Sequence, residues 1–275
     1  MPDRPRTIVH VIARSTAAVV ALALVIGAAG YLYYRSSGDQ LDPAEVVEKD
    51  WLEHLYSQNP QVAEEAANQL HQLGPAALPE VRGVLSDPSA DVSLQKAALK
   101  AVGLLGVSAA PLIPAVAALL PDPALTEEAA VALSFMGREA YGPLEAALAS
   151  DDPVVRREGL RSLGKLRERA PLEARMVVPL LLEGLADPDA GVRVVAATYL
   201  GILADDAGSA VPALIETLAD EDPEVRAAAA TALGSFGTAA AQAVPALREA
   251  ATDRHEDVAR EAGLALVKLQ SSSRR

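Results

Sequence analysis

Apolar and polar residues recur along most of this chain with the period of amphipathic helices, in a unit that itself repeats. Within residues 220–247 the apolar positions fall at i, i+4, i+8 and i+11, which is one face of an α-helix. They are Val225, Ala229, Leu233 and Phe236. A second helix is predicted to follow in each unit, and in the preceding unit its apolar face carries Val211, Leu214, Ile215 and Leu218. A single helix pair has too little surface to bury a core alone, so successive units must stack.

One apolar anchor marks the first helix of each unit, and consecutive anchors are separated by 30 to 37 residues. A period of this size is the signature of a solenoid. The anchors are Leu70, Val102, Leu133, Leu163, Leu200, Leu233 and Leu266.

An Asp-Pro pair recurs where most of the first helices are expected to begin. An Asp can cap a helix start, and Pro is tolerated at the first helical position because its missing N–H would be unpaired there anyway. Gly234 or Gly237 is expected to allow close packing and to let the chain leave the helix. The pairs begin at Asp87, Asp122, Asp152, Asp187 and Asp222, with Asn59-Pro60 as a variant.

The motif Asp-Pro-x-Val-Arg with a following Leu-Gly, found at 152–156 and 222–226, resembles HEAT repeats, particularly the short variety also present in phycobilisome-lyase-like proteins. The match at 187–193 contains two extra residues, and Ala63, Ser93 and Thr126 stand where the first three units would have Arg. The resemblance implies an all-α solenoid of about six helix pairs plus a final helix at roughly 255–269. It also implies that Asp and Arg of each unit, for example Asp222 and Arg226, form a structural ladder between successive repeats.

The solenoid is predicted to span residues 59–269, followed by a disordered tail at 270–275. Residues 35–58 are interpreted as a linker and an N-terminal capping helix at 42–56, with Val47, Trp51 and Leu55 on one face. A cap is expected because an end repeat would otherwise expose its core.

Residues 17–34 contain no charge and, as a helix, would be roughly 27 Å long, close to the hydrocarbon thickness of a bilayer. We therefore predict one transmembrane signal anchor at residues 15–34. Arg4, Arg6 and Arg14 precede it and acidic residues follow it, so the positive-inside rule places residues 1–14 in the cytoplasm and the repeats outside it. This favours a single-pass protein of a bacterial inner membrane. The alternative is a cleaved signal peptide, which would release a secreted, soluble protein.

The net charge of −13 is unevenly distributed: residues 1–38 carry +3, which leaves −16 on the remainder. An acidic body argues against nucleic acid as a partner, because phosphate neutralisation needs clustered Lys and Arg. Cysteine is absent, which excludes disulfides and thiolate metal sites.

The sequence contains no recognisable catalytic constellation. The histidines are scattered, and there is no HExxH, Walker or GxSxG motif. His255-Glu256 resembles the His-Glu pairs that hold two irons in deoxyhypusine hydroxylases, which are also HEAT-like, but a single pair supplies too few ligands. We interpret it as a solvated first helical turn, and we expect no catalytic residue, metal or cofactor. The alternative is an enzyme of the bilin-lyase or metal-hydroxylase type.

Three glutamates occupy equivalent places in consecutive repeats. Glu183, Glu216 and Glu249 each follow a proline by four residues and are 33 residues apart. On the second helix this position points to solvent, so the three are expected to form a row along a concave face. The row is a candidate docking strip for a basic segment of a protein partner. Ordinary solubilising glutamates are the alternative.

A basic stripe is predicted in the fourth repeat, where Arg157, Arg161 and Lys165 are spaced by four residues, with Arg169 next if the helix continues. The same repeat is four residues longer near 167–174, and insertions in repeat proteins often mark the binding face. An acidic partner or anionic lipid headgroups would suit this stripe. A solvated helix partly balanced by Glu158 and Glu168 is the alternative. Together these features predict a non-catalytic, membrane-anchored scaffold or adaptor for a protein partner, and they leave its oligomeric state open.

Overall fold

The computed structural model describes residues 50–55, 57–169 and 174–272, and all regular structure within them is helical. The chain separates into two units, residues 1–49 and 50–275. Because the described residues begin at 50, the predicted cytoplasmic N-terminus, membrane segment and linker at 35–41 lie outside them.

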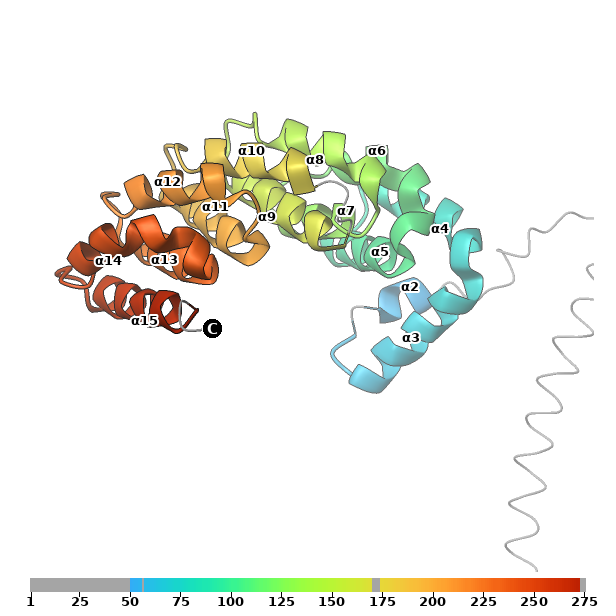
Figure 1. Ribbon diagram of the computed structural model, residues 1–275. Helices are drawn as coiled ribbons and strands as arrows, with labels where there is room; N and C mark the ends of the chain where they lie inside the picture. The colour runs from blue at the N-terminus through green and yellow to red at the C-terminus, as the bar shows by residue number, and fades with distance from the viewer. Residues whose placement is uncertain (1–49, 56, 170–173, 273–275) are drawn as a thin grey trace, which may run out of the picture. The chain divides into compact units, whose positions relative to one another are not determined.

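The described residues form six helix pairs and a final helix (Figure 1). The first helices of the pairs are α3 (Pro60–Leu73), α5 (Val92–Leu105), α7 (Thr126–Leu133), α9 (Pro153–Arg169), α11 (Ala190–Leu203) and α13 (Pro223–Ser235). The second helices are α4 (Leu78–Leu85), α6 (Ile113–Ala117), α8 (Tyr141–Ala147), α10 (Ala174–Gly184), α12 (Ala207–Thr217) and α14 (Val244–Ala250). The final helix is α15 (Glu256–Ser272). In four of the described pairs a short 3-10 helix joins the first helix to the second: η2 (Gly74–Ala77), η3 (Gly106–Leu112), η4 (Arg138–Ala140) and η6 (Gly237–Ala243).

The predicted anchors do form the core. The side chains of Leu133, Leu163 and Leu233 are fully buried, and those of Val225 and Ala229 lie on the same buried face. Leu266, the anchor of α15, is only partly buried, because no further first helix covers that side.

Of the two glycines in the sixth pair, Gly237 lets the chain leave the helix and Gly234 allows close packing. Gly237 has a φ of +55° and lets the chain turn out of α13, as Gly74, Gly106 and Gly137 do in the first three pairs. Gly234 instead packs against the next first helix, where a Cβ would lie 3.1 Å from Cα of Ala265.

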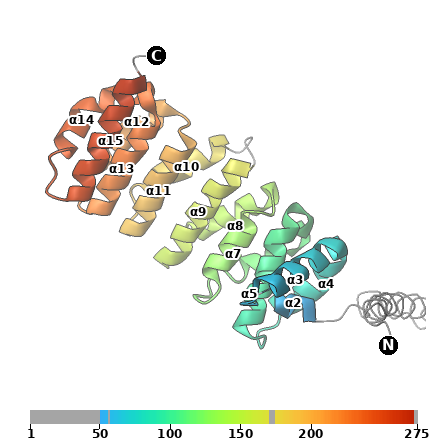
Figure 2. The ribbon, with the colours of Figure 1, turned by 90° about the horizontal axis from the view of Figure 1, so that it is seen from below.

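The array of residues 50–272 is two helices thick (Figures 1 and 2). The first helices lie along the inner, concave side of the arc in Figure 1, and the second helices lie along its outer side. Consecutive first helices pack extensively, most of all α11 on α13 and α13 on α15, whereas consecutive second helices touch only slightly. Tight spacing on one side and wide spacing on the other curves the array.

The short helix α2 (Asp50–His54) is the described part of the predicted capping helix. Trp51, Leu52 and Leu55 are buried, and α2 packs on α3 and α5. At the other end, α15 continues to Ser272, beyond the predicted end at residue 269.

One stretch of the described residues, Val92–Ala117, is long and apolar enough to cross a membrane, with a mean hydropathy of 1.7. It comprises α5, η3 and α6, the second helix pair of the array. A turn at Gly106, with a φ of +56°, divides it, and much of its apolar surface is buried against neighbouring repeats.

Candidate functional site

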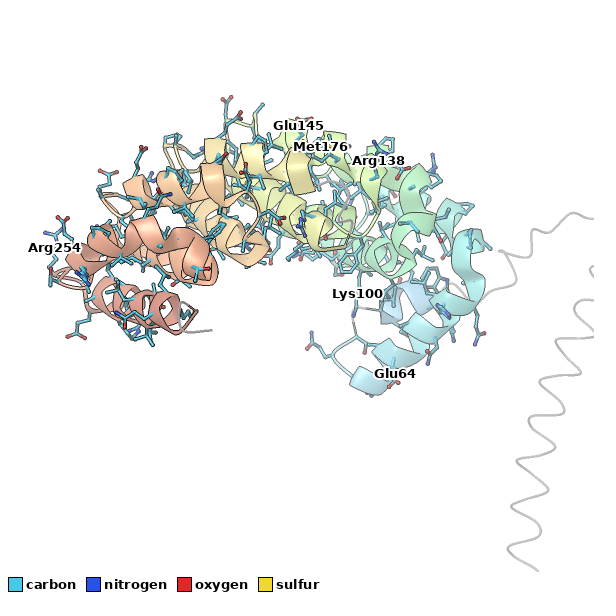
Figure 3. The ribbon with its side chains drawn as sticks, in the orientation of Figure 1. Glu64, Lys100, Arg138, Glu145, Met176 and Arg254 are labelled. Atoms are coloured by element: carbon cyan, nitrogen blue, oxygen red, sulfur yellow. The ribbon has the colours of Figure 1, made fainter. Side chains whose placement is uncertain are left out.

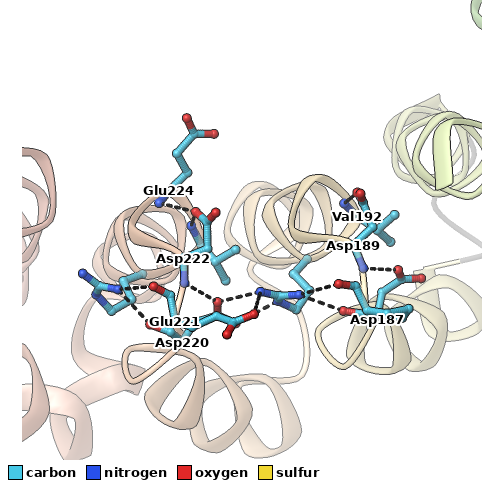
Figure 4. A network of polar contacts seen from close by, with 11 residues as sticks. Asp187, Asp189, Val192, Asp220, Glu221, Asp222 and Glu224 are labelled. Carbon is cyan, nitrogen blue, oxygen red and sulfur yellow. Dashed lines mark hydrogen bonds and ion pairs between the residues drawn. The ribbon is translucent and has the colours of Figure 1, made fainter.

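Within the described residues, an arginine ladder of three rungs joins the last three helix pairs and α15 along one edge of the array, and Figure 4 shows part of it. Arg193 donates from Nε and Nη2 to the two carboxylate oxygens of Asp220, both at 2.8 Å. Its Nη1 donates to the backbone carbonyls of Asp187 and Pro188 at 3.0 and 3.1 Å. Each guanidinium thus ties the loop before its own helix to a carboxylate of the next repeat. Arg156 binds Asp187 and Arg226 binds Asp253 in the same way.

These rungs are well shielded from water: the side chains of Arg193 and Asp220 are 9% and 13% exposed. Hydrogen bonds from Arg156 lower the pKa of Asp187, against the opposing effect of burial. Burial is the largest influence on Asp220, yet the hydrogen bonds from Arg193 and the Asp222 amide together lower its pKa. Hydrogen bonds from Arg226 likewise lower the pKa of Asp253. The rungs are therefore ion pairs at neutral pH.

The ladder confirms the expectation that Asp and Arg link successive repeats, and the structure identifies the partners. Arg226 does not bind Asp222; it binds Asp253 of the following repeat. Asp222 instead caps α13, accepting hydrogen bonds from the amides of Glu224 and Val225.

The prediction that the Asp of each Asp-Pro pair caps a first helix is correct only in part. Asp152 and Asp222 cap their helices. At 187–193, which contains two extra residues, the cap of α11 is Asp189. Asp187 does not cap the helix and instead forms the ion pair with Arg156. In α5 the cap is Asp91 rather than Asp87.

The ladder does not extend into the first repeats. Thr126 stands at the arginine position of α7, and its hydroxyl donates to the carbonyls of Leu120 and Asp122. It satisfies the loop of its own repeat but is too short to reach the next one.

In α3 the arginine position is held by Ala63. In α5 it is held by the buried Gln95 and not, as predicted, by Ser93: Gln95 follows the cap Asp91 by four residues, and its amide donates to the carbonyl of Asp87 in its own loop at 3.3 Å. These replacements leave the first repeats without arginine rungs.

The acidic row lies on the second helices, as predicted, but on the outer layer of the array. Glu183, Glu216 and Glu249 are all exposed, near the C-terminal ends of α10, α12 and α14. The expectation that they line the concave face is wrong, because in this array the second helices form the convex side (Figure 1).

Each of these glutamates borders a surface groove between two second helices. The groove of Glu249, between α12 and α14, has a volume of about 640 Å³ and also reaches Asp253 and Arg226. Glu216 borders a groove of about 320 Å³ and Glu183 one of about 140 Å³. The grooves exist because consecutive second helices are widely spaced, and each opens beside a rung of the ladder.

The basic stripe lies on the concave side, on α9. Arg157 and Arg161 both bind Glu158, at 3.2 Å each, and the carboxylate of Glu158 is only 3% exposed. The predicted balance by Glu158 is therefore real, but two guanidinium groups share one carboxylate, so this cluster keeps a positive charge. The helix does continue to Arg169, and Arg167 forms an ion pair with Asp205 of the next repeat.

Sequence reasoning missed an apolar groove on the concave side, between α5 and α7. It has a volume of about 410 Å³, and Leu104 and Phe135 in its walls are 54% and 36% exposed. The signal was present, since both residues follow the anchors Val102 and Leu133 by two positions. That offset points away from the buried face, where a large apolar side chain is unexpected.

Among the described residues, no group of three His, Asp or Glu side chains is arranged to hold a metal ion. His255 lies at the start of α15, where its amide donates to Asp253 and its carbonyl accepts from Ala259. It therefore belongs to the helix start and to the last rung of the ladder.

The comparisons with known proteins agree with an all-helical repeat solenoid. Residues 178–268 match the family model described as HEAT repeats. Kap121p aligns with 81% of this chain at 14% identity and a TM-score of 0.57, and a Kap121p mutant gives 0.58; the chain spans only 27% of their length. YibA of Escherichia coli aligns at 18% identity and a TM-score of 0.55, over 78% of this chain and 80% of YibA. No curated protein sequence matches. Likeness at these identities concerns the fold alone.

Proposed function

We propose that this protein is a non-catalytic, membrane-anchored HEAT-repeat scaffold that binds protein partners through its repeat surface. The observation that carries the proposal is the periodic outer edge of the last repeats. Three equivalent grooves there each present an exposed glutamate, Glu183, Glu216 or Glu249, beside a fixed rung of the ladder. A surface that repeats along a rigid array suits an extended partner that contacts several repeats at once.

The partner proposed for this edge is a basic segment. Glu249 borders the groove between α12 and α14 and belongs to no rung, and Glu221, whose side chain is 91% exposed, borders the same groove 3.9 Å from Arg193. Asp220 and Asp253 are each neutralised by a ladder arginine, so the exposed glutamates carry the charge offered to a partner. Complementary charge of this kind favours association and selects against acidic partners.

In-cell photocrosslinking tests this proposal. A photoreactive side chain at position 216 should crosslink one reproducible protein through a Lys- or Arg-rich peptide, identified by mass spectrometry. The control position is Glu145, which is exposed on α8 of the same outer layer (Figure 3) but borders none of these three grooves. The triple substitution Glu183→Lys, Glu216→Lys and Glu249→Lys should abolish the crosslink. Equal crosslinking from position 145, or survival after charge reversal, would contradict the proposal.

Membrane anchoring by residues 15–34 belongs to the same proposal. Deletion of 15–34 should release the protein from carbonate-washed membranes. A reporter fused after Arg275 and active only outside the cytoplasm should report activity. A mature N-terminus beyond residue 30 would instead indicate a cleaved signal peptide and a secreted binding protein.

A further inference from the structure

The concave side of the array carries a second surface that differs from the acidic outer edge. Its floor, between α5 and α7, is formed by Leu99, Gly103 and Ala132, and its walls by Leu104, Val131 and Phe135. The volume of about 410 Å³ is within the range of sites that enclose a small ligand or a few side chains. At one end, Lys96 and Glu128 form an ion pair of 2.6 Å across the gap between the two helices.

The groove is open because the backbones of α5 and α7 stay apart. A Cβ on Gly103 would lie 3.8 Å from the ring of Phe135. At the equivalent place in the tightly packed half, a Cβ on Gly201 would lie 2.6 Å from Cα of Ala232. Residues exposed in such a groove contribute little to folding, and contiguous exposed apolar surface of this kind marks interaction sites.

Two lysines and two glutamates line this groove, and the excess of positive charge lies beside it on α9. Lys100 borders the groove and donates at 2.7 Å to the carbonyl of Leu55, which is neutral, so Lys100 retains its charge (Figure 3). On α9, the next first helix, Arg157 and Arg161 share the single carboxylate of Glu158. Counting from the anchors, Arg161 occupies the register position of Lys100, and Lys165 that of Leu104.

Apart from the Lys96–Glu128 ion pair, Lys100 of α5 and Arg157 and Arg161 of α9 stand against two carboxylates, the exposed Glu127 of α7 and the buried Glu158 of α9. The chain as a whole has a net charge of −13. A local positive surface on an acidic protein selects for a partner of opposite charge.

We propose that the groove between α5 and α7, with the basic stripe of α9, binds an acidic amphipathic segment of a protein partner. The segment places an apolar side chain between Leu104 and Phe135 and directs its carboxylates toward Lys100, Arg157 and Arg161. This surface is independent of the acidic outer edge, so one array can hold two segments of opposite charge on its two sides.

Fluorescence anisotropy on the full-length protein in detergent tests this assignment. One probe is a labelled 16-residue helical peptide with Leu and Phe on one face and Glu on the other, and the second has Lys in place of every Glu. The Glu peptide should bind at least about tenfold more tightly than the Lys peptide, which corresponds to about 1.4 kcal/mol. Its affinity should fall as salt increases.

Matched variants locate the binding. Phe135→Asp and Arg161→Glu should each weaken the Glu peptide about tenfold or more. Ile202→Asp should leave it unchanged, because Ile202 occupies the same register on α11 and is 53% exposed but lies outside the groove. Glu216→Lys should also leave it unchanged, which separates this surface from the proposed outer edge. Circular dichroism and the urea midpoint verify that each variant is folded.

Three results would overturn the assignment. One is equal binding of the two peptides, and another is equal weakening by Phe135→Asp and Ile202→Asp. The third is displacement of the Glu peptide by mixed micelles that contain phosphatidylglycerol but not by mixed micelles that contain phosphatidylcholine, which would identify an anionic lipid surface as the occupant.

Discussion

The first helices of the two halves of the array are held at different distances from their neighbours. In the C-terminal half, α11 approaches α13 so closely that no side chain fits at Gly201, and arginine rungs lock successive loops. In the N-terminal half, α5 and α7 have no arginine rung, and an apolar groove remains between them. Gly103 of α5 occupies the same place as Gly201, so the glycine permits close approach of two helices but does not impose it, and a binding surface can open where the rung is missing.

The same comparison distinguishes α15, the last helix of the described residues. Val267 of α15 occupies the place of Gly201 and Gly234, and Ala259 occupies that of the ladder arginines. Val267 is 62% exposed. The outward side of α15 thus lacks both the glycine that permits close packing of a next helix and the arginine that binds an aspartate of a next repeat.

Arg193→Ala is expected to have the largest effect on stability. It leaves Asp220 and two loop carbonyls without their donor in a shielded site, where breaking one side of a buried pair lowers the free energy of unfolding by about 3 kcal/mol. Urea unfolding followed by circular dichroism measures this. The control is Ser93→Ala in the first turn of α5, where Ser93 bonds only to exposed Asp91, and the change should stay below about 0.5 kcal/mol. Equal losses at the two sites would contradict a structural ladder.

Gly201→Ala should rank second, because a Cβ there meets the backbone of Ala232 at 2.6 Å and the two helices must separate. Overpacking of this kind destabilises by about 1–3 kcal/mol. Gly103→Ala in α5, with no close neighbour, should instead stabilise by up to about 1 kcal/mol through helix propensity. The sign of the difference between the two alanine variants, measured by urea unfolding, is the test.

Acid should weaken the links between repeats in the ladder half first, because in the first repeats the pKa values of Asp87 and Asp91 are lowered only by local hydrogen bonds from Ser89 and Ser93. The pKa values of Asp187, Asp220 and Asp253 are lowered by folding. Their contribution is therefore complete above the unfolded value of about 4 and is lost as the pH falls through the lower folded values. Hydrogen exchange with mass spectrometry between pH 5 and pH 3, corrected for intrinsic rates, should show protection falling first in residues 190–253. Asp253→Asn should make the stability of the last two repeats less dependent on pH in that window. Uniform loss along the array would argue against this account.

Val267→Ala should have the smallest effect on the free energy of unfolding. The side chain packs against no following helix, so the free energy of unfolding should stay within about 0.5 kcal/mol of the wild type. A larger loss, again by urea unfolding, would mean that α15 has a packing partner on its outward side.

The helices, the anchors and the existence of a ladder could be predicted because each depends on residues close in sequence or repeated at a fixed period. Leu133 and Leu233 are buried by the spacing of their own helices. The partner of Arg226 could not be predicted, because its guanidinium could reach either Asp222 or Asp253, depending on the geometry of the loops. Only the stacking of the repeats decides between the two aspartates. The side on which Glu216 lies was predicted wrongly for the same reason.

By itself the sequence determined the repeat period, the helical class and the exposure of the acidic row and the basic stripe, since local periodicity sets which face of a helix is apolar. Only the tertiary structure decided which helix layer is concave. Close packing of the first helices through Gly201 and Gly234, with wider spacing of the second helices, sets the direction of curvature. It also decided that Leu104 and Phe135 face one another across an open groove, because the distance between two helices depends on the side chains of both.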